Sequence, residues 1–208
     1  SLGGEMGKAA DTTFIQSRML NRGKGPAVHS LRVQSDRTKY HQYMKKCLEK
    51  TPNLFIKQAE VVSVKTEDGR IVAVETKLGA VHPCKAAIIT TGTYLNGKIH
   101  IGELNYEAGP DNVLPSTGLT ECLKKLGCTM RRFKTGTPAR VHKRSINFEV
   151  LEKQVGDEEI IPFAFDNEEK LENLVDCYVS YTNEETHKVI LDNLHRSPLY
   201  SGRIEGIG

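Results

Sequence analysis

Apolar residues recur at three- and four-residue spacing across residues 36–49, and this period predicts an amphipathic helix. Its apolar stripe is made of Tyr40, Tyr43, Met44, Cys47 and Leu48. Ser35 comes directly before the segment, and its hydroxyl can accept a hydrogen bond from the first amides of a helix. We therefore expect a helix that is capped by Ser35 and ends at Pro52-Asn53.

Shorter apolar runs downstream predict strands of two kinds. Residues 54–56 form a brief apolar run, and residues 61–66 and 71–77 flank a turn at 67–70 with the alternation of a hairpin that has one solvated face. Residues 85–92 are instead continuously apolar and close on small residues, which is typical of a strand buried on both faces. A helix, a hairpin and a buried strand in this order predict an α/β domain around a partly parallel sheet.

The pattern changes after Gly102. We expect a loop with Gly and Pro at 103–116, a helix at 117–126 that Gly127 ends, and a strand at 130–134. Acidic helical segments then alternate with short strands such as 177–181, and Thr182 opens a capping box for a helix that reaches Leu194. We place a domain boundary near Val141, with residues 1–140 in one domain and 141–208 in another.

Composition favours an ordinary globular protein. Of the 208 residues, 38% are hydrophobic and 26% are charged, which is enough apolar material for a core. No apolar run is long enough to span a bilayer, and the N-terminus has no signal pattern. We therefore expect a soluble, cytoplasmic protein with no membrane partner. The net charge of +3 does not by itself indicate nucleic acid.

Basic residues nevertheless gather in one stretch, which contains Arg131, Arg132, Lys134, Arg140, His142, Lys143 and Arg144. Such a cluster can bind phosphates by charge neutralisation, although a solvated surface is the commoner explanation. Alternation along the strand expected at 130–134 turns neighbouring basic residues to opposite faces. A loop can present Arg140, Lys143 and Arg144 together, so these three are our candidates for nucleic-acid binding.

Cysteine and histidine spacings indicate neither a metal site nor a catalytic group. The five cysteines include no C-x-x-C pair, which argues against a disulfide framework and against a zinc site. His187 and His195 lie at the two ends of one predicted helix, too far apart to share a metal. We therefore assign no catalytic residue and no metal ligand.

The end of the strand expected at 85–92 is a candidate ligand site. A buried strand that closes on Thr91, Gly92 and Thr93 brings bare backbone close to a ligand, because glycine has no side chain. Dinucleotides bind at the carboxyl ends of strands in doubly wound sheets, although a tight turn alone would leave the same sequence pattern. No strand is followed by G-x-G-x-x-G, so the chain has no complete dinucleotide fingerprint.

Several further segments occur together in a fixed order. They are Lys24-Gly25-Pro26-Ala27-Val28 with Arg32, Gln34, Asp36 and Arg37; residues 91–102, which read TGTYLNGKIHIG; Lys134-Thr135-Gly136-Thr137-Pro138; Tyr181-Thr182-Asn183-Glu184 with Thr186-His187; and Arg196-Ser197-Pro198 through Gly202 to Ile204-Glu205-Gly206. In this order they resemble the GidA/MnmG family over essentially the whole chain. His29 and Ala139 depart from the residues usual in that family, Arg and Pro.

The resemblance implies a fold and an activity. It implies an incomplete Rossmann-like FAD-binding domain at 1–140 and part of an inserted α/β, NAD-associated domain at 141–208. The family enzyme uses FAD and NADH to add a carboxymethylaminomethyl-type group to the wobble uridine of certain tRNAs. Its partners are tRNA, the GTPase MnmE and a second copy of itself.

The resemblance also carries over a few site residues and shows what is missing. Val61 and Ser116 match flavin-contacting positions, and Gly208 begins the stretch assigned to NAD. The glycine fingerprint and both cysteines associated with catalysis fall outside this sequence. We therefore expect an internal fragment that is inactive and purifies without FAD.

Two alternatives remain open. One is a relative of the folate- and FAD-dependent tRNA uridine methyltransferase, which shares the flavin fold. The other is a non-catalytic module that uses residues 131–144 to bind tRNA or a protein partner.

Overall fold

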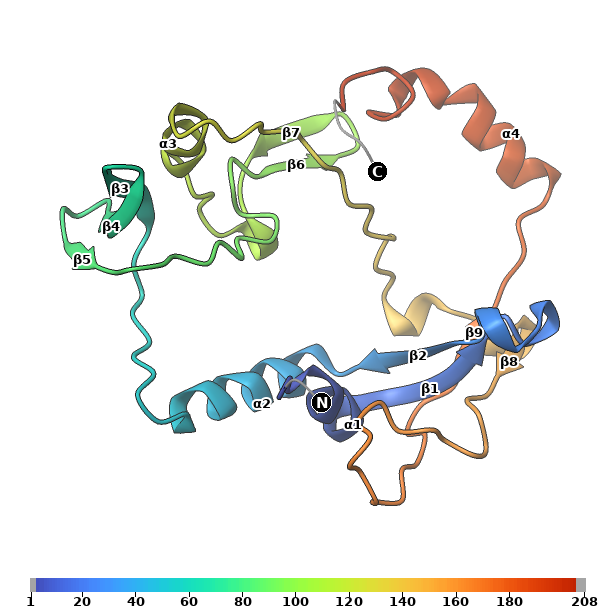
Figure 1. The fold of residues 1–208 in the computed structure, drawn as a ribbon. Coiled ribbons are helices and arrows are strands. Elements are labelled where there is room, and N and C mark those ends of the chain that lie inside the picture. Colours follow the sequence, from blue (N-terminus) through green and yellow to red (C-terminus); the bar gives the residue numbers. More distant parts are fainter. Residues whose placement is uncertain (1–2, 205–208) are drawn as a thin grey trace. The chain divides into compact units, whose positions relative to one another are not determined.

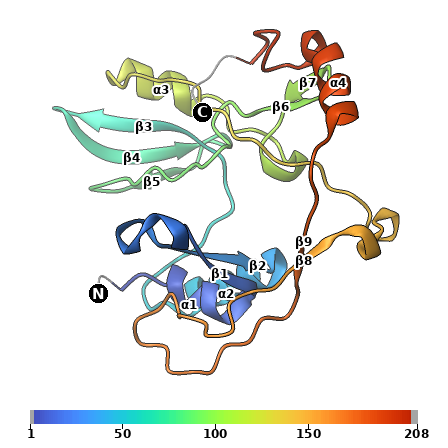
Figure 2. The same cartoon turned by 90° about the vertical axis from the view of Figure 1, so that its right-hand side faces the viewer.

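The computed structural model describes residues 3–204, and these divide into two compact units. The first unit combines the chain up to Ile56 with Arg140–Tyr181, and the second combines Lys57–Ala139 with the residues from Thr182 onward. Figures 1 and 2 show the elements of each unit. The chain passes between the units after Ile56, after Ala139 and after Tyr181.

The first unit is built on an antiparallel strand pair with two helices beside it. Helix α1 (Met6–Thr13) leads directly into β1 (Phe14–Leu20), which pairs with β2 (Ser30–Ser35), and α2 (Arg37–Lys50) follows. Two 3-10 turns, η1 (Arg22–Lys24) and η2 (Pro26–Val28), connect the strands. Helix α1 packs against α2, as Figure 1 shows.

The free edge of β1 is covered by irregular chain rather than by another strand. The Ser17 amide donates to Asn173 Oδ1 at 2.8 Å, and the Asp157 amide donates to the Ser17 carbonyl at 3.0 Å. A short antiparallel pair, β8 (Glu152–Gln154) with β9 (Cys177–Val179), flanks this covering segment. Buried backbone groups on β1 are thereby satisfied, as buried polar groups must be.

Much of the interior of the first unit is polar. Gln16 and Ser17 are 2% and 1% exposed, and Gln16 Nε2 donates to the Gln154 carbonyl at 3.0 Å. Asp11 is also buried, and its carboxylate accepts hydrogen bonds from the amides of Phe163 and Ala164. These contacts join α1 and β1 to the segment beyond residue 140.

The second unit contains an antiparallel three-stranded meander covered by a helix. Strands β3 (Val61–Glu67), β4 (Arg70–Thr76) and β5 (Val81–Pro83) are hydrogen-bonded in that order, and α3 (Leu119–Lys125) packs on β3. Val64, Leu119 and Leu123 are the buried residues of its core. Figure 2 shows α3 above the meander.

The rest of the second unit is a hairpin, a helix and several turns. Strand β6 (Lys98–Ile101) pairs with β7 (Leu104–Glu107), and α4 (Glu184–Asp192) leads into η6 (Leu194–Arg196). The remaining 3-10 turns are η3 (Pro110–Asn112) in this unit, and η4 (Lys143–Ser145) and η5 (Phe148–Val150) in the first unit.

The helices and the hairpin that short-range sequence patterns predict are present, but the N-terminal caps of two helices are other residues than expected. The predicted helices at 36–49 and 117–126 and the hairpin at 61–77 are confirmed by α2, α3 and the β3–β4 pair. The expected cap Ser35 is wrong, because it is the last residue of β2, and the Asp36 carboxylate accepts from the amides of Thr38 and Lys39. Asn183 rather than Thr182 caps α4, through a hydrogen bond from the Thr186 amide.

Three predicted strands do not form. Residues 54–56, 85–92 and 130–134 belong to no named strand, although β9 appears within the segment expected at 177–181. Phe55 and Ile88 are 83% and 90% exposed. A strand needs a neighbour that accepts and donates its ladder hydrogen bonds, and residues 54–56 and 85–90 pair with no strand in the described range.

The predicted partly parallel sheet is absent for the same reason. All named strand pairs among residues 3–204 are antiparallel, and the parallel pairing of Leu95 with Ser116 is an isolated bridge. The coarser expectation, a mixed α/β fold, is confirmed. No helix in the described part of the chain is long and apolar enough to cross a membrane.

Candidate functional site

A tight turn carries the three residues expected to approach a ligand. The Tyr94 amide donates to the Thr91 carbonyl at 3.0 Å, which closes the turn. Gly92 has a φ of 53°, a left-handed conformation that side chains other than Asn and Asp rarely adopt. A Cβ at Gly92 would meet no atom within 4 Å, so there is open space where its side chain would be.

Ser116 is held against this turn by backbone hydrogen bonds. Its amide donates to the Tyr94 carbonyl at 2.9 Å, and its carbonyl accepts from the Asn96 amide at 2.9 Å. These two bonds form the parallel bridge between Leu95 and Ser116. The end of the predicted loop at 103–116 therefore lies beside Thr91, Gly92 and Thr93.

Glu60 joins the same region to the start of β3. One carboxylate oxygen accepts from the Thr117 amide at 2.9 Å, and the other lies 3.0 Å from the ammonium of Lys77. The hydrogen bond from Thr117 is the main reason that the pKa of Glu60 lies below its usual value, and Lys77 adds to the effect. Val61 follows Glu60 directly, so this contact connects Val61 to the segment that carries Ser116.

The groups assembled in this way are accessible. Val61, Thr91 and Ser116 are half-buried, while Gly92 and Thr93 are exposed. Their side-chain hydroxyls make no hydrogen bond with another residue in the range 3–204. We refer to Val61, Thr91, Gly92, Thr93 and Ser116 as the turn cluster; it offers hydroxyls and open backbone and has no ionisable group of its own.

Two glycines that make the turn cluster possible were not predicted as site residues. A Cβ at Gly97 would lie 2.4 Å from the Ala108 carbonyl oxygen, and one at Gly109 would lie 2.8 Å from the Tyr94 ring. Any larger residue would separate β6 from the loop that returns to Ser116. The Asn96-Gly97 pair is a typical turn signal and could have indicated this close approach.

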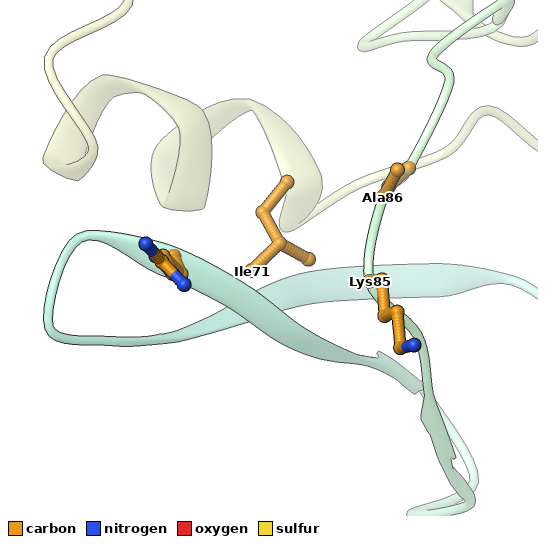
Figure 3. Close-up of a pocket in the computed structure, with 5 residues that line it drawn as sticks. Ile71, Lys85 and Ala86 are labelled. Carbon is orange, nitrogen blue, oxygen red and sulfur yellow. The ribbon is translucent and has the colours of Figure 1, made fainter.

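A hollow of about 540 Å³ lies elsewhere in the second unit. Arg70, Ile71, Lys85, Ala86 and Ala87 line it, and it includes no residue of the turn cluster. In Figure 3, Ile71 points toward α3 while Lys85 extends away from it. The hollow is therefore separate from the turn cluster.

The basic candidates belong to the first unit and remain exposed. Arg140, Lys143 and Arg144 form no ion pair with any residue in the described range. His142 Nδ1 accepts a hydrogen bond from the Arg144 amide at 3.2 Å, and this bond orders the 3-10 turn η4. Arg132 differs, because its guanidinium donates to the Asn96 carbonyl at 3.2 Å in the second unit.

The remaining predictions concern Gly208, the cysteines and metal ligands. Gly208 lies outside the described residues. All five cysteines are free thiols, and Cys122 Sγ accepts from the Val64 amide within the core of the second unit. Residues 3–204 contain no group of three or more His, Cys, Asp or Glu side chains that could hold a metal ion.

Comparison with known proteins identifies the family. The family model described as glucose inhibited division protein A (GidA) matches residues 1–208. The chain belongs to the GidA family. The family model matches the whole chain, so both compact units belong to the same family.

Curated relatives of the GidA chain are much longer than it is. It is 55% identical over 208 residues to the tRNA uridine 5-carboxymethylaminomethyl modification enzyme MnmG of Caldicellulosiruptor saccharolyticus, and it covers 33% of that protein. The MnmG of Clostridium botulinum strain Loch Maree is 53% identical over the same number of residues, again with 33% covered. The chain thus spans about a third of the length of the relatives that it matches.

Solved structures agree with this assignment. Aquifex aeolicus GidA in crystal form I is similar with a TM-score of 0.90 at 45% identity, over 100% of this chain and 36% of that one. Crystal form II of the same protein gives a TM-score of 0.87 at 41% identity, over 98% of this chain and 37% of that one. The mixed α/β structure of this chain therefore matches part of GidA.

Proposed function

We propose that this chain is an internal part of an enzyme that uses FAD and NADH to modify the wobble uridine of tRNA with a carboxymethylaminomethyl-type group. The proposal is supported above all by the 55% identity, along the full 208 residues, to an enzyme named for that modification. Because the chain covers 33% of that enzyme, the activity belongs to the longer protein. The chain alone is expected to be inactive.

Two segments that pair with no strand in the described part of the chain support a Rossmann-like FAD-binding domain that this chain contains only in part. Residues 86–89 are apolar, yet their backbone makes no hydrogen bond with any described residue, and Ile88 is 90% exposed. Residues 54–56 are similarly exposed. In the longer protein, strands from the other two thirds would pair with both segments and complete a parallel sheet, which buries strands on both faces.

The turn cluster is the proposed contribution of this chain to FAD binding. The open backbone at Gly92 and the free hydroxyls of Thr91, Thr93 and Ser116 fit a polar, extended ligand at the end of a strand. When bound, FAD supplies the redox chemistry, and NADH supplies the electrons. The role of these residues is to position the ligand, together with Val61 at the edge of the meander. The family resemblance makes Gly208 the start of the stretch assigned to NAD.

The proposed domain assignment rests on the family resemblance. Residues 1–140 would belong to the FAD-binding domain and residues 141–208 to the inserted domain associated with NAD. tRNA would be the substrate, with Arg140, Lys143 and Arg144 as contacts to its phosphates. The family resemblance adds the GTPase MnmE and a second copy of the protein as partners.

Anaerobic reduction of the full-length protein tests the proposed use of both cofactors. The purified protein should carry a visible flavin band that NADH bleaches and air restores. A protein that contains this chain but binds no flavin, or holds a flavin that NADH leaves oxidised, would refute the proposal.

A further inference from the structure

One arginine in the second unit is oriented by two hydrogen bonds while part of its hydrogen-bonding edge stays free. Arg196 Nε donates to Glu103 Oε1 at 3.0 Å, and its Nη1 donates to Asn193 Oδ1 at 3.2 Å. Its Nη2 group has no hydrogen-bond partner among residues 3–204. A guanidinium fixed in this way loses little side-chain entropy when it binds a phosphate with its open edge.

The next eight residues fold into a closed turn beside this arginine. The Ser201 amide donates to the Ser197 carbonyl at 2.9 Å, and the Ile204 amide donates to the Pro198 carbonyl at 3.0 Å. The hydrogen bond from Arg196 is the main reason that the pKa of Glu103 lies below its usual value, and the positive charge of Arg203 in this turn lowers that pKa further. Glu103 pairs with Arg196 alone among the described residues, so the charge of Arg203 is not neutralised by an ion pair with Glu103.

Tyr200 lies in the same turn and presents its ring to solvent. It is 72% exposed, and its hydroxyl makes no hydrogen bond with a described residue. An exposed aromatic ring and arginines carried by one short turn are a usual combination for binding single-stranded nucleic acid, in which bases stack on rings and phosphates contact arginines. A partner protein with acidic residues would use the arginines but would gain little from an isolated ring.

We propose that Arg196, Tyr200 and Arg203 form a binding site for an unpaired stretch of RNA, with one base stacked on Tyr200 and the adjacent phosphates held by the two arginines. The inference rests on the proposed function, which makes tRNA the substrate. It adds a second contact region to the one already proposed at Arg140, Lys143 and Arg144. Glu103 is a positioning residue here, because it orients Arg196 without touching the RNA.

Binding of a tRNA transcript to the full-length protein provides the test. Tyr200→Ala should weaken the affinity about tenfold, whereas Tyr200→Phe should retain it, because the ring rather than the hydroxyl stacks. Arg203→Gln should reduce the log–log salt slope by about 0.7 to 0.9. Tyr181→Ala is the matched control, since Tyr181 is 80% exposed outside the turn, and it should bind like the wild type.

Further readouts separate the possible causes. Thermal unfolding should show equal midpoints for wild type and Tyr200→Ala, and NADH should reduce the flavin of both at the same rate. Wild-type binding that persists unchanged in Tyr200→Ala and Arg203→Gln would overturn this inference and leave the proposed function intact. A loss of NADH-dependent reduction with unchanged tRNA affinity would assign the turn to the dinucleotide instead and would also overturn it. Failure of the wild type to bind tRNA would refute the proposed function itself.

Discussion

At Gly92 a single backbone angle decides which substitutions can test cofactor contact. With a φ of 53° the position tolerates glycine and, at small cost, asparagine. A β-branched residue is strained there by about 1 to 2 kcal/mol, whether or not a ligand is near. A valine substitution alone would therefore confuse strain with loss of contact.

We predict that Gly92→Asn in the full-length protein lowers flavin occupancy at least severalfold while the thermal midpoint stays within a few degrees of wild type. Gly92→Val should lower both, because it adds backbone strain to the steric block. Flavin absorbance per protein and thermal unfolding supply the two readouts. Full occupancy in Gly92→Asn would show that the turn does not approach the cofactor.

Glu60 links pH to the stability of the region around the turn cluster. Its pKa is lowered in the folded protein, first by the hydrogen bond from Thr117 and then by Lys77. A lowered folded-state pKa contributes stability above the unfolded-state value of about 4.5, and that contribution is lost as the pH falls through the folded-state value.

Glu60→Gln should therefore lower the thermal midpoint at neutral pH, and the difference from wild type should shrink as the pH drops below about 4.5. The amide oxygen of Gln can still accept the hydrogen bond from Thr117, so the change isolates the charge. Lys77→Gln, which removes only the ion pair, should have a smaller effect. A midpoint difference that is constant with pH would contradict the predicted role.

At the scale of elements, sequence patterns predict the helices and hairpins that form between neighbouring residues. They do not predict strands that need a partner distant in the sequence. Helix α2 and the β3–β4 hairpin follow from apolar spacing and turn residues, and both form. The strand expected at 85–92 has the right residues but no neighbour within the described chain. Strand β1 was not predicted because its most buried residues, Gln16 and Ser17, are polar.

The candidate site shows the same division. Thr91, Gly92 and Thr93 could be singled out because a strand-like run ends there, and Val61 and Ser116 came from the family resemblance. Neither source predicts that Glu60 bonds the Thr117 amide, because that contact joins residues 57 positions apart. Long-range hydrogen bonds of this kind bring the predicted residues together, and no spacing rule encodes them.

The turn η4 and its basic neighbours give a prediction about nucleic acid. Replacing Arg140, Lys143 and Arg144 with Ala in the full-length protein should reduce the log–log salt slope of tRNA binding by about two to three, if each neutralises one phosphate. Replacing three exposed lysines of α2 (Lys39, Lys46 and Lys50) is the matched control and should leave the slope unchanged. An unchanged slope in the first variant would show that Arg140, Lys143 and Arg144 form a solvated surface and do not contact tRNA phosphates.

At the scale of the whole molecule, the proposal gives this chain only part of a cofactor site. The pyrophosphate of a dinucleotide normally rests on a glycine-rich turn at a helix N-terminus, and this sequence has no such fingerprint. The turn cluster alone offers hydroxyls and backbone without a charged group.

We therefore predict that the isolated 208-residue chain purifies without FAD, whereas the full-length protein purifies with it. Absorbance spectra of the two proteins, expressed in the same host, make the comparison. A stoichiometric flavin band in the isolated chain would contradict the prediction and would mean that the described residues suffice for tight binding.

The central claim is that this chain belongs to an enzyme that modifies the wobble uridine of tRNA. Mass spectrometry of nucleosides from unmodified tRNA, treated with the full-length protein, the proposed GTPase partner, NADH and the folate and amine donors, tests it most directly. The account predicts a carboxymethylaminomethyl-type group on the wobble uridine, and none when the isolated chain replaces the full-length protein. An unmodified wobble uridine, or a methylated uridine elsewhere in the tRNA, would contradict the claim.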